Sequence, residues 1–412
     1  MIYKKINCCR ICGNENLSEI IDLGMQALGG RFPRIGEVDP PSAPLVLVKC
    51  NGKDSCGLLQ LKHDISGEEL FRHEYGYRSG INTTMVNHLD SVRAKIEKRM
   101  NLKKGDIVLD IGSNDATFLK SYTVKGLQKI GIDPTSDHFK KHYTKDIIRV
   151  PDFFSKESYD KHLSEKAKVI TSIAMFYDLP DPMAFVKDIK NTLHPEGIWV
   201  LEQSYMPFML RQNAFDTICH EHLEYYAFKQ INWLLKANDL KAIDIDFNDI
   251  NGGSFRVTVA HKDAKVFSNV KIITSTLFKE HQMKLDTLEP YEEFVERIEN
   301  IKDETMFFIS SKFKQGKTFY LYGASTKGNT LLQYYRLNDK MIVGAAERNP
   351  KKYGKMTPLT HIPIMSEKDV RAAKPDYMLV LPWHFKKEFI KREKEYLKEG
   401  NFIFPLPKFS VV

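Results

Sequence analysis

Five of the six cysteines lie within the first 56 residues, and four of them form two pairs that could bind a metal ion. Cys9 and Cys12 make a C-x2-C knuckle, and Cys50 and Cys56 follow further along the chain. Two pairs of thiolates can close a tetrahedral shell around Zn²⁺ with no open position, which suits a structural ion. Gly13, directly after the knuckle, allows the tight turn that such a knuckle needs. The alternative is that the four side chains are small buried hydrophobic groups.

Three residues suited to proton transfer stand in immediate succession in the segment FDTICHEHLEYYAF: His220, Glu221 and His222. The spacing is not H-E-x-x-H, so the two imidazoles do not recur one helical turn apart and a metalloprotease site is excluded. On an extended segment His220 and His222 would share one side, with Glu221 on the other. A histidine with a pKa near neutrality can remove a proton from a substrate, whereas a solvated polar loop is the alternative interpretation.

A further polar cluster ends the apolar segment DIVLDIGSND. Gly112 lets a ligand approach the backbone closely, and Asp133 ends the next apolar segment, where a carboxylate can accept both hydroxyls of a ribose. The dinucleotide pattern G-x-G-x-x-G is absent, because Ser113, Asn114 and Asp115 follow Gly112. The layout therefore indicates a nucleoside site without a cradle for a pyrophosphate.

These side chains need elements that bring them together, and residues 101–203 alternate strand-like and helix-like stretches. The expected strands are residues 106–115, 128–134, 167–175 and 197–204. Alternation of this kind builds βαβ units and a parallel sheet, so the sequence predicts an α/β fold. Since the carboxyl ends of parallel strands share one edge, the polar loop and Asp133 are expected to face one crevice.

The segment TFYLYG, followed by residues 324–329, predicts another strand that turns into a helix. It is not a nucleoside-triphosphate loop, since Lys327 precedes Gly328 and no Gly-Lys-Ser/Thr closes the segment. Backbone N–H groups at the start of the helix, together with Lys327, would still accept an anion such as a diphosphate ester. Residues 266–315 carry Lys and Glu around periodic apolar residues and are expected to form linking helices with solvated charged faces.

The composition limits the possible classes of protein. With 412 residues, 42% apolar and 28% charged, the chain is long enough for two or three domains and is not largely disordered. A net charge of +8 is modest for this length, so an anionic small molecule is a better partner than nucleic acid. No apolar run is long enough for a membrane span, and the first residues lack the pattern of a signal peptide. A cytoplasmic protein with no membrane partner is expected.

Taken together, these features resemble the S-adenosylmethionine-dependent C-methyltransferases that modify nucleotide-linked 4-keto-deoxysugars. The similarity rests on the cysteine pairs, the D-x-G-S-N-D loop, the H-E-H block and the segments TFYLYGASTKGNTLL, VGAAERNPKKYGKMTPLTHIPI and PDYMLVLPWHF. It covers nearly the whole chain. It implies a zinc-binding module at residues 1–72, a class I methyltransferase core with a Rossmann-like sheet at 73–261, and a second Rossmann-like domain at 262–412 that binds the nucleotide sugar. S-adenosylmethionine and a structural zinc ion are the implied cofactors.

The resemblance also implies a role for each candidate residue. The metal ligands would be Cys9, Cys12, Cys50 and Cys56. The cofactor would contact Asp110, Gly112, Ser113 and Asn114 in the first loop, Asp133 at the ribose, and Asp152 and Phe153 beside the adenine. His222 would be the general base, assisted by Glu221, His220 and Tyr177, with Tyr75 and Tyr77 in a linker folded over the site. The nucleotide-sugar cleft would be lined by Lys327, Asn329, Glu347, Arg348 and His384.

The implied reaction is methylation of a ring carbon, with C3 as the first choice, on a sugar used for a surface glycan or a glycosylated metabolite. A carbonyl beside that carbon makes the reaction possible, because loss of the α hydrogen gives an enolate whose charge the enzyme can stabilise. Cys219 stands where relatives often carry tyrosine, so one hydroxyl donor of the family is missing. The alternatives are O- or N-methylation of a sugar or small metabolite, and non-catalytic binding of a nucleotide sugar or nucleic acid.

Overall fold

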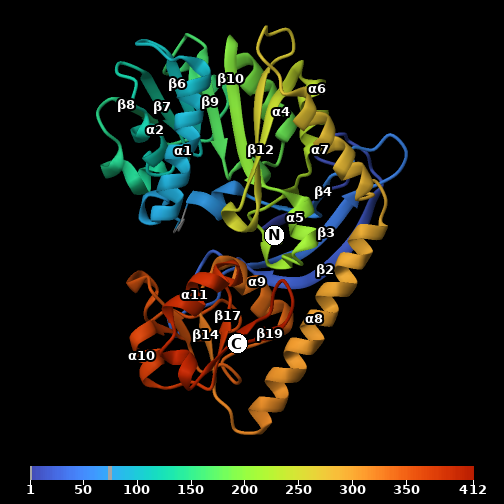
Figure 1. Ribbon diagram of the computed structural model, residues 1–412, viewed down its shortest axis with the longest axis vertical. Coiled ribbons are helices and arrows are strands. Elements are labelled where there is room, and N and C mark those ends of the chain that lie inside the picture. Colours follow the sequence, from blue (N-terminus) through green and yellow to red (C-terminus); the bar gives the residue numbers. More distant parts are fainter. Residues whose placement is uncertain (1, 73–76) are drawn as a thin grey trace.

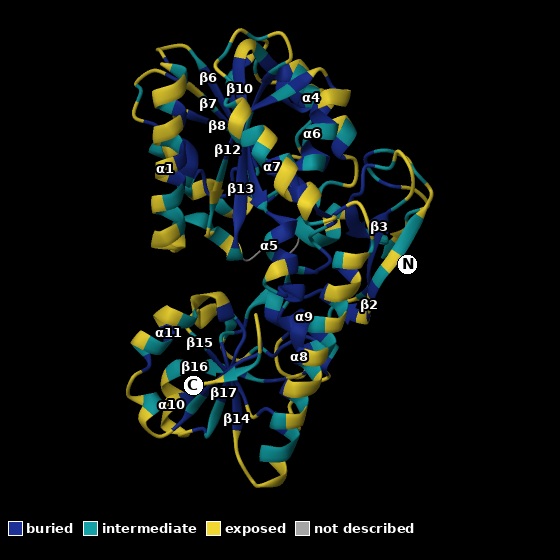
Figure 2. Ribbon diagram, turned by 45° about the vertical axis from the view of Figure 1, so that its right-hand side comes forward, coloured by how far each residue is buried: buried dark blue, intermediate teal, exposed yellow. Residues whose placement is uncertain are grey.

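The computed structural model describes residues 2–72 and 77–412, with only the backbone described at residue 72. In Figure 1 a seven-stranded sheet lies at the top, a six-stranded sheet at the bottom, and a smaller sheet of amino-terminal strands between them at one side. Figure 2 shows that the strands are buried and that the outer faces of the helices are exposed. Within the described residues, no helix is long and apolar enough to cross a membrane.

The central sheet has the strand order β12-β13-β10-β9-β6-β7-β8. Its strands are β6 (Ile107–Ile111), β7 (Gln128–Ile132), β8 (Ile147–Val150), β9 (Ala167–Ile173), β10 (Leu193–Ser204), β12 (Leu240–Asn248) and β13 (Ser254–His261). The strands from β8 to β10 run parallel, while β13 is antiparallel to both β10 and β12. All five residues of β6 are buried, as expected for a parallel strand covered on both faces. The α/β fold and its parallel sheet are confirmed.

Helices cover both faces of this sheet (Figure 1). They are α1 (Thr83–Met100), α2 (Thr117–Ser121), α3 (Lys156–Asp160), α4 (Pro182–Thr192), α6 (Phe228–Ala237) and α7 (Val270–Gln282), whereas α5 (Met206–Arg211) lies below the sheet and contacts α8. The longest of them, α1, begins after Asn82, whose side chain accepts two backbone N–H groups of the first turn. Its buried positions Leu89, Val92 and Ile96 recur at helical spacing and belong to an apolar cluster on one face of the sheet.

The amino-terminal strands form a four-stranded antiparallel sheet in the order β11-β4-β3-β2. Its strands are β2 (Leu17–Ala27), β3 (Ser42–Cys50), β4 (Leu59–Leu61) and β11 (Glu224–Tyr225); β1 (Tyr3–Lys5) and β5 (His63–Ile65) form a separate pair. The edge strand β11 comes from the central segment of the chain and follows the H-E-H block directly. The amino-terminal sheet is therefore completed by the segment that carries His222.

The carboxy-terminal sheet has the order β16-β15-β14-β17-β18-β19 and is parallel except at β19. Its strands are β14 (Phe319–Tyr322), β15 (Ala345–Glu347), β16 (Ile364–Ser366), β17 (Tyr377–Val380), β18 (Asn401–Phe404) and β19 (Ser410–Val411), with helices α9 (Thr326–Tyr335), α10 (Glu367–Ala372) and α11 (Lys386–Arg392). The long helix α8 (Glu289–Lys314) leads into it along the side of the molecule (Figure 1). The predicted second Rossmann-like unit and its linking helices are confirmed.

Candidate functional site

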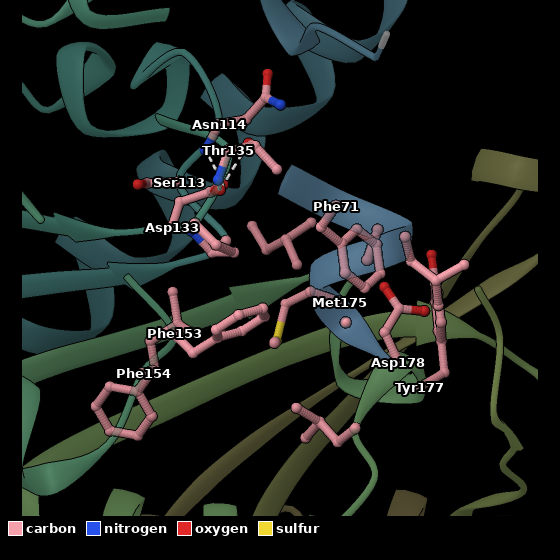
Figure 3. Close-up of a pocket in the computed structure, with 18 of the residues that line it drawn as sticks. Phe71, Ser113, Asn114, Asp133, Thr135, Phe153, Phe154, Met175, Tyr177 and Asp178 are labelled. Carbon is pink, nitrogen blue, oxygen red and sulfur yellow. Dashed lines mark hydrogen bonds between the residues drawn. The ribbon is translucent and has the colours of Figure 1, made fainter. Parts of the chain in front are cut away.

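A cavity of about 700 Å³ opens at the carboxyl ends of β6, β7 and β9, where a doubly wound sheet binds its ligands. Predicted site residues that line it are Tyr77, Asp110, Gly112, Ser113, Asn114, Asp133, Phe153, Tyr177, His222 and Lys327. We call the part formed by Asp110, Gly112, Ser113, Asn114 and Asp133 the nucleoside end. We call the part formed by Tyr177, His222 and Lys327 the inner end. In Figure 3, Asp133 and Asn114 lie at one side of the cavity and Tyr177 at the other.

Asp133 organises the nucleoside end. Its Oδ2 accepts the backbone N–H of Asn114 at 2.7 Å, and its Oδ1 accepts both the N–H and the hydroxyl of Thr135 at 2.6 Å (Figure 3). These bonds fix the carboxylate at the cavity wall, while burial raises its pKa. These bonds use three of the roughly four acceptor sites of the carboxylate, so one site on Oδ2 remains for a ribose hydroxyl.

Gly112 and Asp110 lie deeper at the nucleoside end. Gly112 has a φ of +74°, and a Cβ atom there would lie 3.0 Å from the Met175 side chain. The missing side chain thus keeps the cavity open beside the loop. Asp110 accepts the Thr171 hydroxyl at 2.6 Å, and burial raises its pKa to about 7. A ligand ammonium group beside Asp110 would favour the ionised carboxylate.

The segment that precedes α1 is fastened to the loop of the nucleoside end. Asn114 uses its side chain for this purpose: its Oδ1 accepts the N–H of Ser79 at 3.0 Å, and its Nδ2 donates to the Tyr77 carbonyl at 3.1 Å. Arg78 pairs with buried Asp115 at 3.0 Å. Tyr77 therefore lines the cavity as part of a docked segment. The other predicted tyrosine of this linker, Tyr75, lies outside the described residues.

Aromatic residues form the wall that was predicted to face an adenine. Phe153 and its neighbour Phe154 both line the cavity, and Gly67 lies so close that a Cβ there would be 3.1 Å from the Phe153 ring. Asp152 is exposed, and its Oδ1 accepts the Phe153 N–H at 2.8 Å. It does not line the cavity, because the chain turns its side chain toward solvent at this point.

His222 is the imidazole that faces the inner end. Its Nδ1 lies 2.9 Å from the Thr217 carbonyl oxygen, which can only accept, so Nδ1 carries the proton and Nε2 has the free lone pair. The Tyr177 ring packs edge-on against the imidazole with centroids 4.5 Å apart. Burial and the charge of Lys327 lower the pKa of His222 to about 3. The imidazole is therefore neutral at physiological pH, with its pKa below the near-neutral value that the sequence suggested.

The other two members of the H-E-H block point away from the cavity. The segment is a turn, closed by a 3.0 Å bond from the His222 N–H to the Cys219 carbonyl, and not an extended strand. His220 and His222 consequently do not share a side, and His220 instead contacts the Ala43 carbonyl at 3.2 Å. The Glu221 carboxylate lies against Gly30 of the amino-terminal region, and burial raises its pKa. Neither His220 nor Glu221 lines the cavity.

The five predicted residues of the carboxy-terminal unit divide into two groups. Lys327 and His384 line a small cavity of about 30 Å³ that adjoins the inner end, and Lys327 also lines the large one. Asn329 is buried and donates to the Gly29 carbonyl at 2.7 Å. Glu347 accepts the Ala324 N–H at 3.1 Å, and Arg348 is exposed. Asn329 serves a contact between units and Glu347 one within its unit, and none of these last three residues lines either cavity.

The four cysteines come together as predicted. Their sulfur atoms all lie within 4.8 Å of one another, with Cys9 and Cys56 at 3.4 Å and Cys12 and Cys50 at 3.5 Å. Zinc–sulfur bonds of about 2.3 Å in a tetrahedron place sulfur atoms about 3.8 Å apart, so the set fits a closed Zn²⁺ site. Gly13 has the predicted tight turn, with a φ of +72°. Cys8 is exposed and does not belong to the cluster.

Some residues of the cavity were not recognised in the sequence. Asp178 follows Tyr177 and lines the cavity; burial and the nearby Glu221 and Glu224 raise its pKa well above the ordinary value (Figure 3). Asn251, in a turn before β13, lines both cavities. The acidic residues in FYDLPDP could have indicated Asp178 from the sequence. The position of Asn251 could not be predicted, because it depends on how β13 folds back beside β10.

Comparison with known families divides the chain into three parts. Residues 9–71 match the family described as "Putative zinc binding domain", residues 85–245 match "Methyltransferase domain", and residues 249–407 match "C-methyltransferase C-terminal domain". The order of these matches follows the order of the three sheets along the chain.

One curated relative matches the chain over its full length, and two solved structures are similar to part of it. The C-methyltransferase NovU of Streptomyces niveus is 28% identical over 419 residues, covering 100% of this chain and 98% of the relative. Among solved structures, the mitomycin 7-O-methyltransferase MmcR is 12% identical with a TM-score of 0.36, covering 44% of this chain and 55% of that one. The magnesium protoporphyrin IX methyltransferase ChlM of Synechocystis PCC 6803 is 11% identical with a TM-score of 0.33, covering 43% of this chain and 79% of that one.

Proposed function

Since this chain is an S-adenosylmethionine-dependent C-methyltransferase with a zinc-binding domain, we propose that its substrate is a nucleotide-linked 4-keto-deoxysugar. The methyl group would go to a ring carbon beside the keto group, with C3 as the first choice. The observation that supports this most is the shared cavity, in which an imidazole with a free Nε2 lies beyond a nucleoside end. The proposed units are residues 1–72, 73–261 and 262–412.

The residues of the nucleoside end fit the cofactor. Asp133 would accept a ribose hydroxyl, the backbone at Gly112 would approach the cofactor closely, and Asp110 would face its ammonium group. When bound, S-adenosylmethionine supplies an electrophilic methyl group.

His222 is the proposed general base. Its Nε2 would accept the proton from the carbon next to the carbonyl, because Nδ1 already donates to the Thr217 carbonyl. Tyr177 packs edge-on against the imidazole and would donate to the sugar. An anionic substrate would raise the low pKa of His222, since nearby negative charge favours the imidazolium form.

Zinc has a structural part in this proposal. The bound ion would hold the β3 and β4 region, and β4 in turn receives β11 through the Leu61 N–H to Leu223 carbonyl bond of 2.8 Å. Leu223 also donates to the Tyr177 carbonyl at 2.8 Å. The zinc-binding module therefore braces the segment on which His222 stands.

The test is incubation with S-adenosylmethionine and dTDP-, CDP-, GDP- and UDP-linked 4-keto-deoxysugars in deuterated buffer, followed by mass spectrometry and NMR. We expect one of the four to gain a methyl group on carbon. Without cofactor, that sugar should still exchange its α hydrogen for deuterium, because the enolate forms before methyl transfer. Methylation on oxygen or nitrogen, or no transfer to any ketosugar, would contradict the proposal.

A further inference from the structure

We propose that Lys327 of the carboxy-terminal unit is a catalytic residue that stabilises the enolate oxygen, and not a ligand for the diphosphate. The proposal rests on the proposed function, since it assigns a partner for the charge that His222 creates. Lys327 lines the large cavity and the small one beside it, and in both it shares the wall with Tyr177 and His222. The methyltransferase core and the carboxy-terminal unit thus meet at the inner end.

The position of Lys327 is fixed by its neighbours on the first turns of α9. The Ser325 hydroxyl accepts the Gly328 N–H at 3.0 Å and caps the helix. Gly328 packs against Leu381 so tightly that a Cβ there would lie 2.6 Å from its side chain. Asn329 and Thr330 then bind carbonyls of two other regions, Gly29 and Ile218. The predicted substrate role of Asn329 is thereby replaced by a positioning role.

One short segment of the core positions both the base and the lysine. The Thr217 carbonyl accepts from Nδ1 of His222 at 2.9 Å, and the next carbonyl, that of Ile218, accepts the Thr330 hydroxyl at 3.0 Å. Any movement of this segment shifts the imidazole and the start of α9 together. Such coupling is expected where two groups must act on adjacent atoms of one substrate.

The ammonium group of Lys327 is available to a ligand. Within residues 2–72 and 77–412 it forms no hydrogen bond or ion pair, although four titratable groups face it: Asp216, Cys219, His222 and His384. The Asp216 carboxylate already accepts the Trp383 indole N–H at 2.9 Å, and burial raises its pKa to about 6. The lysine charge also lowers the pKa of His222 and His384. A cation placed beside the base makes the base weaker, unless a negative charge develops between the two.

The enolate supplies that charge. The C–H bond beside the carbonyl breaks, its proton goes to Nε2 of His222, and its electron pair moves onto the carbonyl oxygen, next to the Lys327 ammonium. The electron pair then returns to form the new C–C bond as the methyl–sulfur bond breaks, and the sulfur keeps the bonding pair. Oriented charge of this kind, held in a site that excludes water, is worth about 10²–10³-fold in rate.

The test compares Lys327→Met with the wild type and with Lys340→Met, which makes the same change at an exposed lysine of the same unit. Using the ketosugar that the wild type methylates, we expect Lys327→Met to lower kcat and cofactor-free deuterium exchange by about 10²-fold or more. The KM for the sugar and the dissociation constant for S-adenosylmethionine should stay within about threefold of wild type, and Lys340→Met should match wild type throughout.

A Lys327→Met enzyme with unchanged kcat and a raised KM would overturn the proposal, because that result assigns the lysine to the diphosphate. Unchanged kcat and KM would overturn it as well. If Lys327→Met no longer binds S-adenosylmethionine, the same measurements on Lys327→Gln decide between these outcomes. Absence of exchange in the wild type would instead contradict the proposed function, so the two failures are distinguishable.

Discussion

The two ends of the cavity are built in different ways. The nucleoside end comes from one continuous stretch, in which the ends of β6 and β7 supply Asp110, Gly112 and Asp133 from a single sheet. The inner end is assembled from three regions: Tyr177 follows β9, His222 precedes β11, and Lys327 comes from α9. Cofactor binding should therefore survive damage to the outer units, whereas turnover should not.

The largest difference between the effect on turnover and the effect on cofactor affinity should come from His222→Ala. Removing the base should lower turnover by about 10³-fold, within the range for general base catalysis, while the affinity for S-adenosylmethionine stays near wild type. Steady-state kinetics and isothermal titration calorimetry measure the two quantities. His220→Ala is the matched control, since that imidazole contacts the Ala43 carbonyl outside the cavity. Its loss should lower the free energy of unfolding and leave kcat near wild type. Normal turnover of His222→Ala would remove it from the base role.

Loss of the metal should also lower turnover more than it lowers the affinity for the cofactor. Cys12→Ser opens the four-cysteine cluster, so we expect zinc to be lost and the β4 support of β11 to loosen. A shift of about 1 Å at His222 can cost about 10²-fold in turnover, whereas the nucleoside end should keep its affinity for the cofactor. Elemental analysis, kinetics and calorimetry follow these effects. Cys8→Ser, at the exposed cysteine, should keep its zinc; a Cys12→Ser protein that also kept stoichiometric zinc would contradict the ligand assignment.

Acidification should act on the nucleoside end. Asp110 has a pKa of about 7, so lowering the pH from 8 to 6 protonates the carboxylate that would face the cofactor ammonium group. Affinity for S-adenosylmethionine should fall by about tenfold over this range, as expected for one linked proton. Protonation of His222 should not contribute to this loss of affinity, since burial and the Lys327 charge lower its pKa to about 3. Calorimetry at several pH values tests this, and Asp110→Asn should give a flat profile if the assignment is correct.

The smallest effect is expected inside the loop of the nucleoside end. Ala116 is buried with a φ of +58°, a conformation that favours glycine. Ala116→Gly should relieve backbone strain of about 1 kcal/mol in the folded protein. Glycine also raises the conformational entropy of the unfolded chain, which offsets part of this stabilisation. We expect thermal denaturation to show a net gain below about 1 kcal/mol, with turnover unchanged. Ala167→Gly, at a buried residue of strand β9, should instead destabilise the protein by about 1 kcal/mol.

The same contrast explains what could be predicted from the sequence. The nucleoside end is local, so a strand pattern followed by Gly112 and an acid at the next strand end were enough to predict it. The cysteine pairs were equally informative, because few arrangements other than a metal site bring four thiols together. The inner end depends on a turn at residues 219–222, which points the side chains of His220 and His222 in different directions. It also depends on the contact of Asn329 with Gly29, a residue far away in the sequence. No periodicity or spacing contains that information.

The pairing of β11 with β4 affects how the chain folds during its synthesis. The edge of β4 receives its partner only after residues 62–223 have left the ribosome, since Glu224 pairs with Gln60. Until then the amino-terminal sheet exposes unpaired backbone groups, which are a template for aggregation. Early capture of zinc by the nascent chain would keep β3 and β4 in place during this interval. The yield of soluble enzyme should therefore depend on the zinc supplied during translation, even when zinc is added in excess afterwards.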